Sequence, residues 1–202
     1  EHYKISCEKI NVIHNGYDPS IYYPLGTEAR LKLRSELGVN SNNLNLLFSG
    51  SGWERKDLYW LLKFFSFLLS KRRNSILWVA GKGKNKKVLR MSKKLGINQN
   101  IKYLGMVKNI EQLYQVFDFM ILPTLYDPFS NSCLEAIACG CDVFTTEKNG
   151  ISEILSFDNI IKKNNKNEYQ RIFNMIFDGR KIKRHKLNTQ EIELNMYLNI
   201  LK

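Results

Sequence analysis

Two carboxylates, Asp127 and Glu135, lie eight positions apart in one short segment of the chain. The apolar run before them, residues 117–123, predicts a buried strand. Residues 132–139 carry apolar side chains at helical spacing and stop at Gly140, which predicts a helix. Asp127 would then lie in the connecting loop and Glu135 about one turn into the helix. The free N–H groups and the positive dipole end of a helix N-terminus suit a phosphate, and the two acids could hold polyhydroxylated groups on either side of it.

A basic pair, Arg55 and Lys56, follows a second candidate loop, the glycine-rich run 49–53. We expect the apolar run 44–48 to be a strand, and we expect Glu54 to open a long helix. Basic side chains after a flexible loop could reach a shared cleft, where charge-assisted hydrogen bonds to a phosphate are strong. A dibasic pair alone is weak evidence, because it is ordinarily just exposed to solvent. Its position after a strand and a glycine loop favours a functional role.

Predicted strands and helices alternate along most of the chain. The strands are expected at residues 44–48, 76–80, 101–104, 117–123, 141–145 and 159–161. Helices are expected at residues 110–116 and 168–177 as well. The helix that Glu54 opens is apolar on two sides, which predicts that it lies between the sheet and another element. This order predicts an α/β fold: a Rossmann-like, doubly wound parallel sheet with helices on both faces. Such sheets bind ligands at the carboxyl ends of their strands. The loops expected there are 49–56, 81–83, 105–108, 123–131 and 146–150, and the candidate residues lie in these loops or just beyond them.

The segment Tyr126-Asp-Pro-Phe-Ser-Asn-Ser-Cys-Leu-Glu-Ala-Ile-Ala-Cys-Gly140 resembles the donor-binding motif of the retaining group 1 glycosyltransferases, which have the GT-B fold. In that family two acids at this spacing bracket the sugar and the ribose of a sugar nucleotide. The resemblance implies that Asp127 positions the sugar and that Glu135 accepts hydrogen bonds from the ribose hydroxyls. The first acid is usually Glu, and the shorter Asp127 implies a small shift of the sugar. Two further departures stand where the family often has Pro and Gly: Asp142 and Asp57.

The same resemblance implies the remaining donor contacts. Arg55 and Lys56 would grip the diphosphate and form the catalytic set together with Asp127. The glycine loops near the nucleotide would contain Gly50, Gly52, Gly81 and Gly83. The backbone that reads the base edge would belong to Gly105, Met106 and Val107. The hexose would meet backbone groups of Phe129 and Ser130, and the phosphates would meet a helix start formed by Asn131, Ser132 and Cys133.

The resemblance further implies a two-domain enzyme, of which this chain is the C-terminal, donor-binding half. Residues 1–24 are expected to be linker and domain edge, 25–162 the Rossmann-like donor-binding domain, and 163–202 terminal helices. Within the linker, residues 10–18 predict a short apolar strand that runs into an Asn-Gly turn, with His14 as a polar residue of this hinge strand. The acceptor-binding N-terminal domain should precede Glu1, so the chain alone should be inactive. The nearest family pattern is that of glucosyltransferases that extend the inner core of lipopolysaccharide. It implies transfer of a hexose, glucose, from a UDP-sugar to a glycan or glycolipid. An Asp-x-Asp element is absent, so neither a metal nor a cofactor is expected.

Positive charge is unevenly placed along the chain, whose net charge is +12. Residues 58–110 hold thirteen Lys or Arg and no acid. The densest cluster is Lys82, Lys84, Lys86, Lys87, Arg90, Lys93 and Lys94. One interpretation is a solvated helix face; the other is attraction to an anionic membrane surface, a phosphorylated glycolipid or nucleic acid. Aromatic residues are not interleaved with these lysines, so we expect no nucleic-acid partner.

The composition of the chain also indicates in which cellular compartment the protein works. No apolar run approaches the roughly 20 residues that cross a bilayer, and the chain does not start with a secretory signal. Four cysteines show neither a disulfide framework nor zinc spacing: Cys7, Cys133, Cys139 and Cys141. They predict small core residues in a reducing compartment. We therefore expect a cytoplasmic protein, peripheral at the inner face of the membrane.

Two other classes of function stay open on the sequence alone. One is a non-catalytic module that binds a nucleotide sugar, which the shorter acid at Asp127 favours. The other is a basic nucleic-acid-binding domain, which has no motif in its favour. Paired carboxylates can also serve a glycosidase, but the resemblance commits Glu135 to the ribose.

Overall fold

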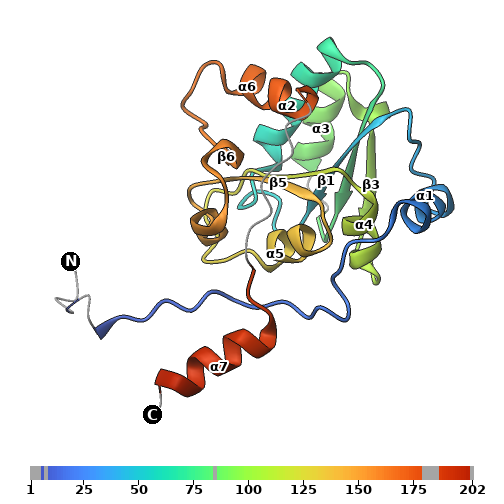
Figure 1. The fold of residues 1–202 in the computed structure, drawn as a ribbon. Helices are drawn as coiled ribbons and strands as arrows, with labels where there is room; N and C mark the ends of the chain where they lie inside the picture. The colour runs from blue at the N-terminus through green and yellow to red at the C-terminus, as the bar shows by residue number, and fades with distance from the viewer. Residues whose placement is uncertain (1–5, 7–8, 84–85, 179–186, 201–202) are drawn as a thin grey trace.

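The computed structural model describes residues 6, 9–83, 86–178 and 187–200, and its centre is a six-stranded sheet (Figure 1). The strand order is β3-β2-β1-β4-β5-β6, and every neighbouring pair is parallel. The strands are β1 (Leu44–Ser49), β2 (Ser75–Ala80), β3 (Ile101–Gly105), β4 (Phe119–Leu122), β5 (Asp142–Thr146) and β6 (Ile160–Ile161). The α-helices are α1 (Thr27–Glu36), α2 (Leu58–Lys71), α3 (Lys86–Lys94), α4 (Ile110–Val116), α5 (Asn131–Ala138), α6 (Glu168–Phe177) and α7 (Gln190–Ile200), and short 3₁₀ turns include η3 (Gly150–Ile154). The predicted parallel α/β sheet is confirmed.

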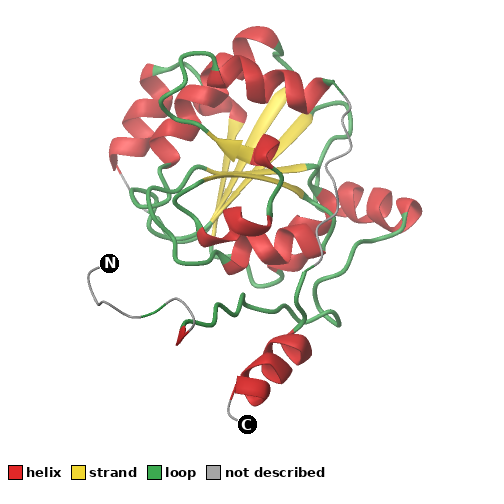
Figure 2. Ribbon diagram, turned by 60° about the vertical axis from the view of Figure 1, so that its left-hand side comes forward, coloured by secondary structure: helices red, strands yellow, loops and turns green. Residues whose placement is uncertain are grey.

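Helices cover both faces of the sheet (Figures 1 and 2). Helices α2, α3 and α6 pack together on one face, and α1, α4 and α5 pack together on the other. The central strands are therefore sealed from water on both sides, and all six residues of β1 are buried. This is why the central strands form continuous apolar runs in the sequence instead of alternating with polar residues.

Helix α2 is apolar on two sides because it lies between the sheet and α6. Its sheet side is fully buried at Leu58, Leu61, Leu62, Phe65 and Leu68. On its other side, the rings of Trp60 and Phe64 lie 5.1 and 5.7 Å from the ring of Tyr169 in α6. The second apolar side thus packs against another helix, as the sequence predicts.

The expected start of α2 at Glu54 is wrong, because residues 53–57 form turns and the helix begins at Leu58. Asp57 is its N-cap, and the Asp57 side chain accepts a hydrogen bond from the N–H of Trp60 at 3.1 Å. Asp57 has a left-handed backbone with φ of 50°, where Asp is better tolerated than most residues and Gly is free of strain. Arg55 and Lys56 therefore lie in the turn before the helix, not in its first turn.

The expected strand at residues 10–18 is also wrong. These residues are extended, but among the described residues only Tyr17 forms a bridge, to Thr189. Ile10 and Val12 are more than half exposed, so the apolar pattern here does not mark a place in the sheet. The Gly16 N–H donates to the carboxylate of Glu193 at 2.8 Å, which ties this segment to α7.

Cys133, Cys139 and Cys141 are buried free thiols, as expected for core residues. Cys7 and Lys84, which the sequence analysis also named, lie outside the described residues. Within the described ranges, no helix is both long and apolar enough to cross a membrane.

Candidate functional site

The chain changes direction across the sheet between β1 and β4. From β1 it proceeds to β2 and β3 on one side, and from β4 it proceeds to β5 and β6 on the other. The region at the carboxyl ends of β1 and β4, called the crevice below, is therefore the place where open α/β sheets bind ligands. The loop after β1 carries Arg55 and Lys56, and the loop after β4 carries Asp127.

A buried ion pair joins these two loops. The Lys56 ammonium contacts the Asp127 carboxylate, and the two residues are only 6% and 7% exposed. Arg55 is more exposed; its guanidinium lies 3.4 Å from the same carboxylate and donates to the carbonyl of Tyr126 at 2.8 Å. The Leu125 N–H donates to the carbonyl of Arg55 at 2.8 Å, which fixes the backbones as well. The three predicted catalytic residues thus lie together.

Glycine residues allow the loops after β1, β2 and β3 to pack closely. A Cβ on Gly81, which has φ of 117°, would lie 2.3 Å from the carbonyl oxygen of Gly50. The Gly81 N–H donates to the carbonyl of Gly105 at 2.7 Å. A Cβ on Gly83 would lie 2.2 Å from the indole of Trp53. The predicted glycines therefore do come together, and Gly81 and Gly83 are required by the packing of the loops themselves.

The loop of Asp127 is held from the far side by the loop that follows β5. The Asp127 N–H donates to the carbonyl of Lys148 at 2.9 Å, and the Asp127 carbonyl accepts from the N–H of Gly150 at 3.0 Å. A Cβ on Gly150 would lie only 1.9 Å from the carbonyl oxygen of Pro128. Asn149 is fully buried, and its side chain accepts from the N–H of Ser130 at 3.1 Å. Sequence reasoning read Asn149 and Gly150 only as a turn, because their partners are about twenty positions away.

Helix α5 begins at Asn131 and points its N-terminus into this crevice. Its N-cap, Ser130, makes no side-chain cap hydrogen bond in the described structure. The Ser130 hydroxyl instead lies 3.0 Å from that of Ser132, which is also 3.4 Å from the carbonyl oxygen of Ser49 at the end of β1. Cys133 is fully buried, and burial raises the pKa of its thiol to about 12. The positive end of the helix is thus available to an anion beside Lys56.

Glu135 lies on the next turn of α5 in quite different surroundings. It is half-buried. Burial raises the pKa of the Glu135 carboxyl, and the nearby side chains of Tyr22 and Tyr114 oppose that rise. Sequence reasoning did not find Tyr22, which belongs to the segment before α1.

Residues 14 and 15, in the same segment before α1, contact Phe129 and the start of α5. The imidazole of His14 stacks on the ring of Phe129 with centroids 5.4 Å apart, and its Nε2 lies 2.9 Å from the Glu153 carboxylate. The Asn15 side chain donates to that of Asn131 at 2.7 Å. The sequence suggested only a hinge residue at His14, whereas the structure places it at the predicted hexose-binding loop.

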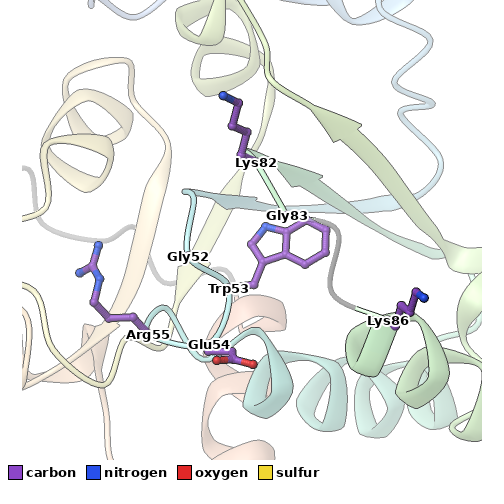
Figure 3. Close-up of a pocket in the computed structure, with 7 residues that line it drawn as sticks. All are labelled: Gly52, Trp53, Glu54, Arg55, Lys82, Gly83 and Lys86. Carbon is purple, nitrogen blue, oxygen red and sulfur yellow. The ribbon is translucent and has the colours of Figure 1, made fainter.

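An open pocket of about 600 Å³ adjoins the ion pair (Figure 3). It is lined by Gly52, Trp53, Glu54, Arg55, Lys82, Gly83 and Lys86. In Figure 3 the indole of Trp53 lies between Arg55 and Lys86, and the three cations give the pocket a positive balance. No pattern in the sequence singles out Trp53, which is 5% exposed.

The predicted base-reading residues lie farther away. Met106, which is 66% exposed, and Val107 follow β3 at the edge of the sheet. Because β3 is two places from β1, about 10 Å separates these strands. A ligand that reaches both regions must therefore be extended, as a nucleotide is.

Three comparisons place this geometry among known proteins. Residues 43–172 match the family model described as "Glycosyl transferases group 1". An uncharacterized glycosyltransferase of Methanocaldococcus jannaschii is 29% identical over 155 residues, which cover 75% of this chain and 40% of that protein. Lipopolysaccharide glucosyltransferase WaaG of Escherichia coli is 26% identical over 158 residues, which cover 77% and 42%.

A solved structure of the Anabaena protein HepE in complex with UDP and glucose has a TM-score of 0.81 to this chain at 20% identity, and the match covers all of this chain and 59% of that one. The fold is thus that of the C-terminal domains of GT-B glycosyltransferases. The chain spans about 40% of the length of the curated relatives it matches. Because the family model covers more than half of the chain, the protein belongs to the group 1 glycosyl transferases.

Proposed function

We propose that this chain is the donor-binding half of a retaining hexosyltransferase that moves glucose from a UDP-sugar to a glycan or glycolipid acceptor, such as a lipopolysaccharide core. The observation that carries the proposal is the buried contact between Lys56 and Asp127 at the crevice between β1 and β4. It brings a phosphate-binding cation and a sugar-binding acid to the point where such sheets bind ligands. The likeness to WaaG and to HepE supports the substrate class.

In this proposal the diphosphate lies between the start of α5 and the basic pair. Lysine has three N–H donors, so Lys56 can keep its contact with Asp127 and still donate to a phosphate oxygen. Arg55 adds a second charge from the more exposed side. We assign charge neutralisation to these cations and to the backbone of Asn131–Cys133, and we propose that no metal is needed.

The sugar would then meet Asp127 and the backbone of Phe129 and Ser130, and the ribose would meet Glu135. Asp127 holds the hexose so that its anomeric carbon faces the acceptor, a positioning effect that matters most near the transition state. In the retaining route we favour, the acceptor attacks from the same face as the leaving phosphate, and that phosphate takes the acceptor proton. The acceptor would be held by an N-terminal domain of the same protein.

Calorimetry of this chain with UDP, UDP-glucose and uridine, in the presence of a chelator, tests the donor site. We expect UDP and UDP-glucose to bind and uridine to bind far more weakly, because the cations act on the phosphates. Absence of heat and of thermal stabilisation at millimolar ligand would rule out the proposed site. The chain alone should transfer no sugar, and robust transfer by residues 1–202 would contradict the two-domain assignment.

A non-catalytic nucleotide-sugar-binding module is the alternative, and Asp127 in place of the family's usual Glu favours it. Both alternatives predict donor binding. Only transfer by the whole protein separates them, so the decisive assay uses the full-length protein with a glycolipid acceptor.

We also propose that the protein works at the cytoplasmic face of a membrane. Exposed cations on α3, namely Lys86, Lys87, Arg90, Lys93 and Lys94, support an anionic partner surface. Cosedimentation should therefore be strong with vesicles that contain phosphatidylserine and weak with phosphatidylcholine alone. Equal binding to both would argue that this is simply a solvated helix face.

A further inference from the structure

The segment before α1 brings a histidine to the loop that is proposed to hold the hexose. The imidazole of His14 stacks on the ring of Phe129, with centroids 5.4 Å apart and ring planes 25° apart. One position along, the Asn15 side chain donates to that of Asn131 at 2.7 Å, at the first residue of α5. Two neighbouring residues of one segment therefore contact the loop and the helix that follows it.

The backbone of the same segment is fixed from its other side by residues at and before α7. The Asn188 side chain donates to the carbonyl of His14 at 3.3 Å, and the Gly16 N–H donates to the carboxylate of Glu193 at 2.8 Å. A Cβ on Gly16 would lie 2.4 Å from the carbonyl oxygen of Thr189. The segment thus runs between α5 and α7 (Figure 1), and the packing of three parts of the chain sets the position of His14.

The carboxylate of Glu153 determines which ring nitrogen of His14 carries the proton. Nε2 lies 2.9 Å from this carboxylate. A carboxylate only accepts hydrogen bonds, so Nε2 carries the proton and donates it to the bond. In the neutral imidazole Nδ1 is then an acceptor, and the described part of the chain gives it no hydrogen-bond partner. His14 thus offers one unused acceptor on a ring whose tautomer and plane are both set by neighbours.

A ligand in the proposed hexose position can reach this ring. The His14 side chain is 29% exposed, and the ring that it covers belongs to the same loop as Asp127. Asp127 and Phe129 are two positions apart, which spans at most about 7 Å of backbone. The Asp127 N–H donates to the carbonyl of Lys148 at 2.9 Å, so this loop is anchored. A hexose that contacts Asp127 therefore also lies near the ring stacked on Phe129.

We infer that His14 is a donor-specificity residue whose Nδ1 accepts a hydrogen bond from a hydroxyl of the transferred hexose. Glu153 is a positioning residue that fixes the tautomer, and Phe129 fixes the plane of the ring. The nucleotide does not take part in this contact, so it acts on the sugar alone. The inference rests on the proposed function, because it takes the loop of Asp127 and Phe129 to be the hexose-binding loop.

The test measures the dissociation constants of UDP and of UDP-glucose for the 202-residue chain by calorimetry and compares their ratio among variants. His14→Phe keeps a ring on Phe129 but removes the acceptor, so UDP-glucose should bind about threefold more weakly while UDP binding stays unchanged. His14→Asn loses the ring but places an amide oxygen close to the position of Nδ1, so it should keep more of the wild-type ratio than His14→Phe does. The matched control is Tyr23→Phe, which alters a 47% exposed ring of the same segment and should leave the ratio unchanged.

UDP-glucose analogues that each lack one hexose hydroxyl identify the group that Nδ1 contacts. One of these analogues should bind the wild-type chain about threefold more weakly than UDP-glucose does. In His14→Phe that difference should vanish, because the hydrogen bond is then missing with either ligand. If no analogue shows a difference that depends on His14, the inference is wrong.

The outcomes separate the inference from the function on which it rests. If the wild-type chain does not bind UDP, the proposed donor site fails, and the inference fails with it. If the wild-type chain binds both ligands and His14→Phe leaves their ratio unchanged, the inference alone is overturned. Equal weakening of UDP and UDP-glucose would also overturn it, because that pattern reports a structural loss. A ratio that His14→Phe keeps and His14→Asn loses would show that the ring only packs on Phe129.

Discussion

Asp127 and Glu135 lie only eight residues apart, but their surroundings differ. Asp127 lies in the loop after β4, and Glu135 lies in helix α5. Asp127 is buried against the cations Lys56 and Arg55, whereas Glu135 is half-buried near the neutral side chains of Tyr22 and Tyr114. Asp127 balances charge that would otherwise be unpaired inside the crevice. The two acids of the motif therefore differ: Asp127 takes part in a buried ion pair, and Glu135 lies among neutral side chains.

Removal of Lys56 should give the largest effect. Lys56→Ala leaves the Asp127 carboxylate buried with only Arg55 nearby, and breaking a buried ion pair costs about 3–5 kcal/mol. We therefore expect a large loss of free energy of unfolding, measured by urea denaturation. The double variant Lys56→Met with Asp127→Asn removes both charges and should recover much of that loss.

A matched control for this variant is Lys163→Ala. Lys163 contacts Asp57, but this pair is more exposed than the pair of Lys56 and Asp127, so its loss should cost about 1 kcal/mol or less. Equal losses in Lys56→Ala and Lys163→Ala would show that burial of the first pair has no energetic consequence.

The next effect is on binding, where the two acids should separate. Glu135→Gln should weaken UDP and UDP-glucose alike, by roughly tenfold, because the charged acceptor of the ribose hydroxyls is lost. Asp127→Asn should leave UDP binding nearly intact and weaken only the contribution of the hexose. Calorimetry with both ligands and both variants tests this. If neither variant changes the dissociation constant of either ligand, the assignment of the two acids is wrong. It is also wrong if Asp127→Asn weakens UDP binding as much as Glu135→Gln does.

A smaller effect should appear in the pH dependence of stability. Burial raises the pKa of Glu135 above its ordinary value of 4.5, so the fold favours the protonated form. The stability that the protonated Glu135 carboxyl contributes is complete below the pKa of this carboxyl in the unfolded state. It is lost as pH rises through its pKa in the folded state. Glu135→Gln removes this dependence, so its stability relative to wild type should increase as pH rises above 4.5 and through the raised folded-state pKa.

Asp142 offers a comparison carboxylate away from the site. Burial, followed by repulsion from Asp118, raises the pKa of Asp142 from 3.8 to about 6. Asp142→Asn should therefore gain stability relative to wild type as pH rises from 3.8 through about 6, with no change in UDP binding. Denaturation curves at several pH values check both variants, and a difference that runs in the opposite direction would contradict the assigned shifts.

The smallest effect is expected at His14. His14→Ala removes the stacking on Phe129 and the bond to Glu153, which is largely exposed. We expect a loss of about 1 kcal/mol or less in stability. Binding of UDP should stay unchanged, while UDP-glucose weakens slightly, because Phe129 lies on the hexose side of the site. A clear loss of UDP affinity would show that residues 14–15 act on the phosphates instead.

Local patterns in the sequence predicted most of the sheet. The buried strands are continuous apolar runs, and helices such as α4 and α6 begin and end where their spacing and flanking residues indicate. The start of α2 was missed, although Asp57 directly before Leu58 is a typical N-cap residue. The prediction of a strand at residues 10–18 was wrong, because an apolar run cannot reveal whether a neighbouring strand is there to pair with it.

The site was predictable only as far as its residues lie in strand-end loops. The sequence indicated which loops converge, but not which atoms meet. His14 and Phe129 stack although they are more than a hundred positions apart, and the contacts that Asn149 makes depend on how two loops pack. Such contacts are set by tertiary structure, and a single sequence carries no periodicity or spacing that would reveal them.

Because Cys133 is buried, chemical labelling of its thiol reports on opening of the start of α5. Its thiol lies in the first turn of α5, with a pKa raised by burial to about 12 and the amide of Asn149 3.8 Å from the sulfur. An alkylating reagent reacts with the thiolate, so modification at this position requires the helix start to open. The rate of labelling at Cys133, resolved by peptide mass spectrometry, therefore measures how often the start of α5, which we propose binds phosphate, detaches from the sheet. A ligand that closes the crevice should slow that rate in proportion to its occupancy.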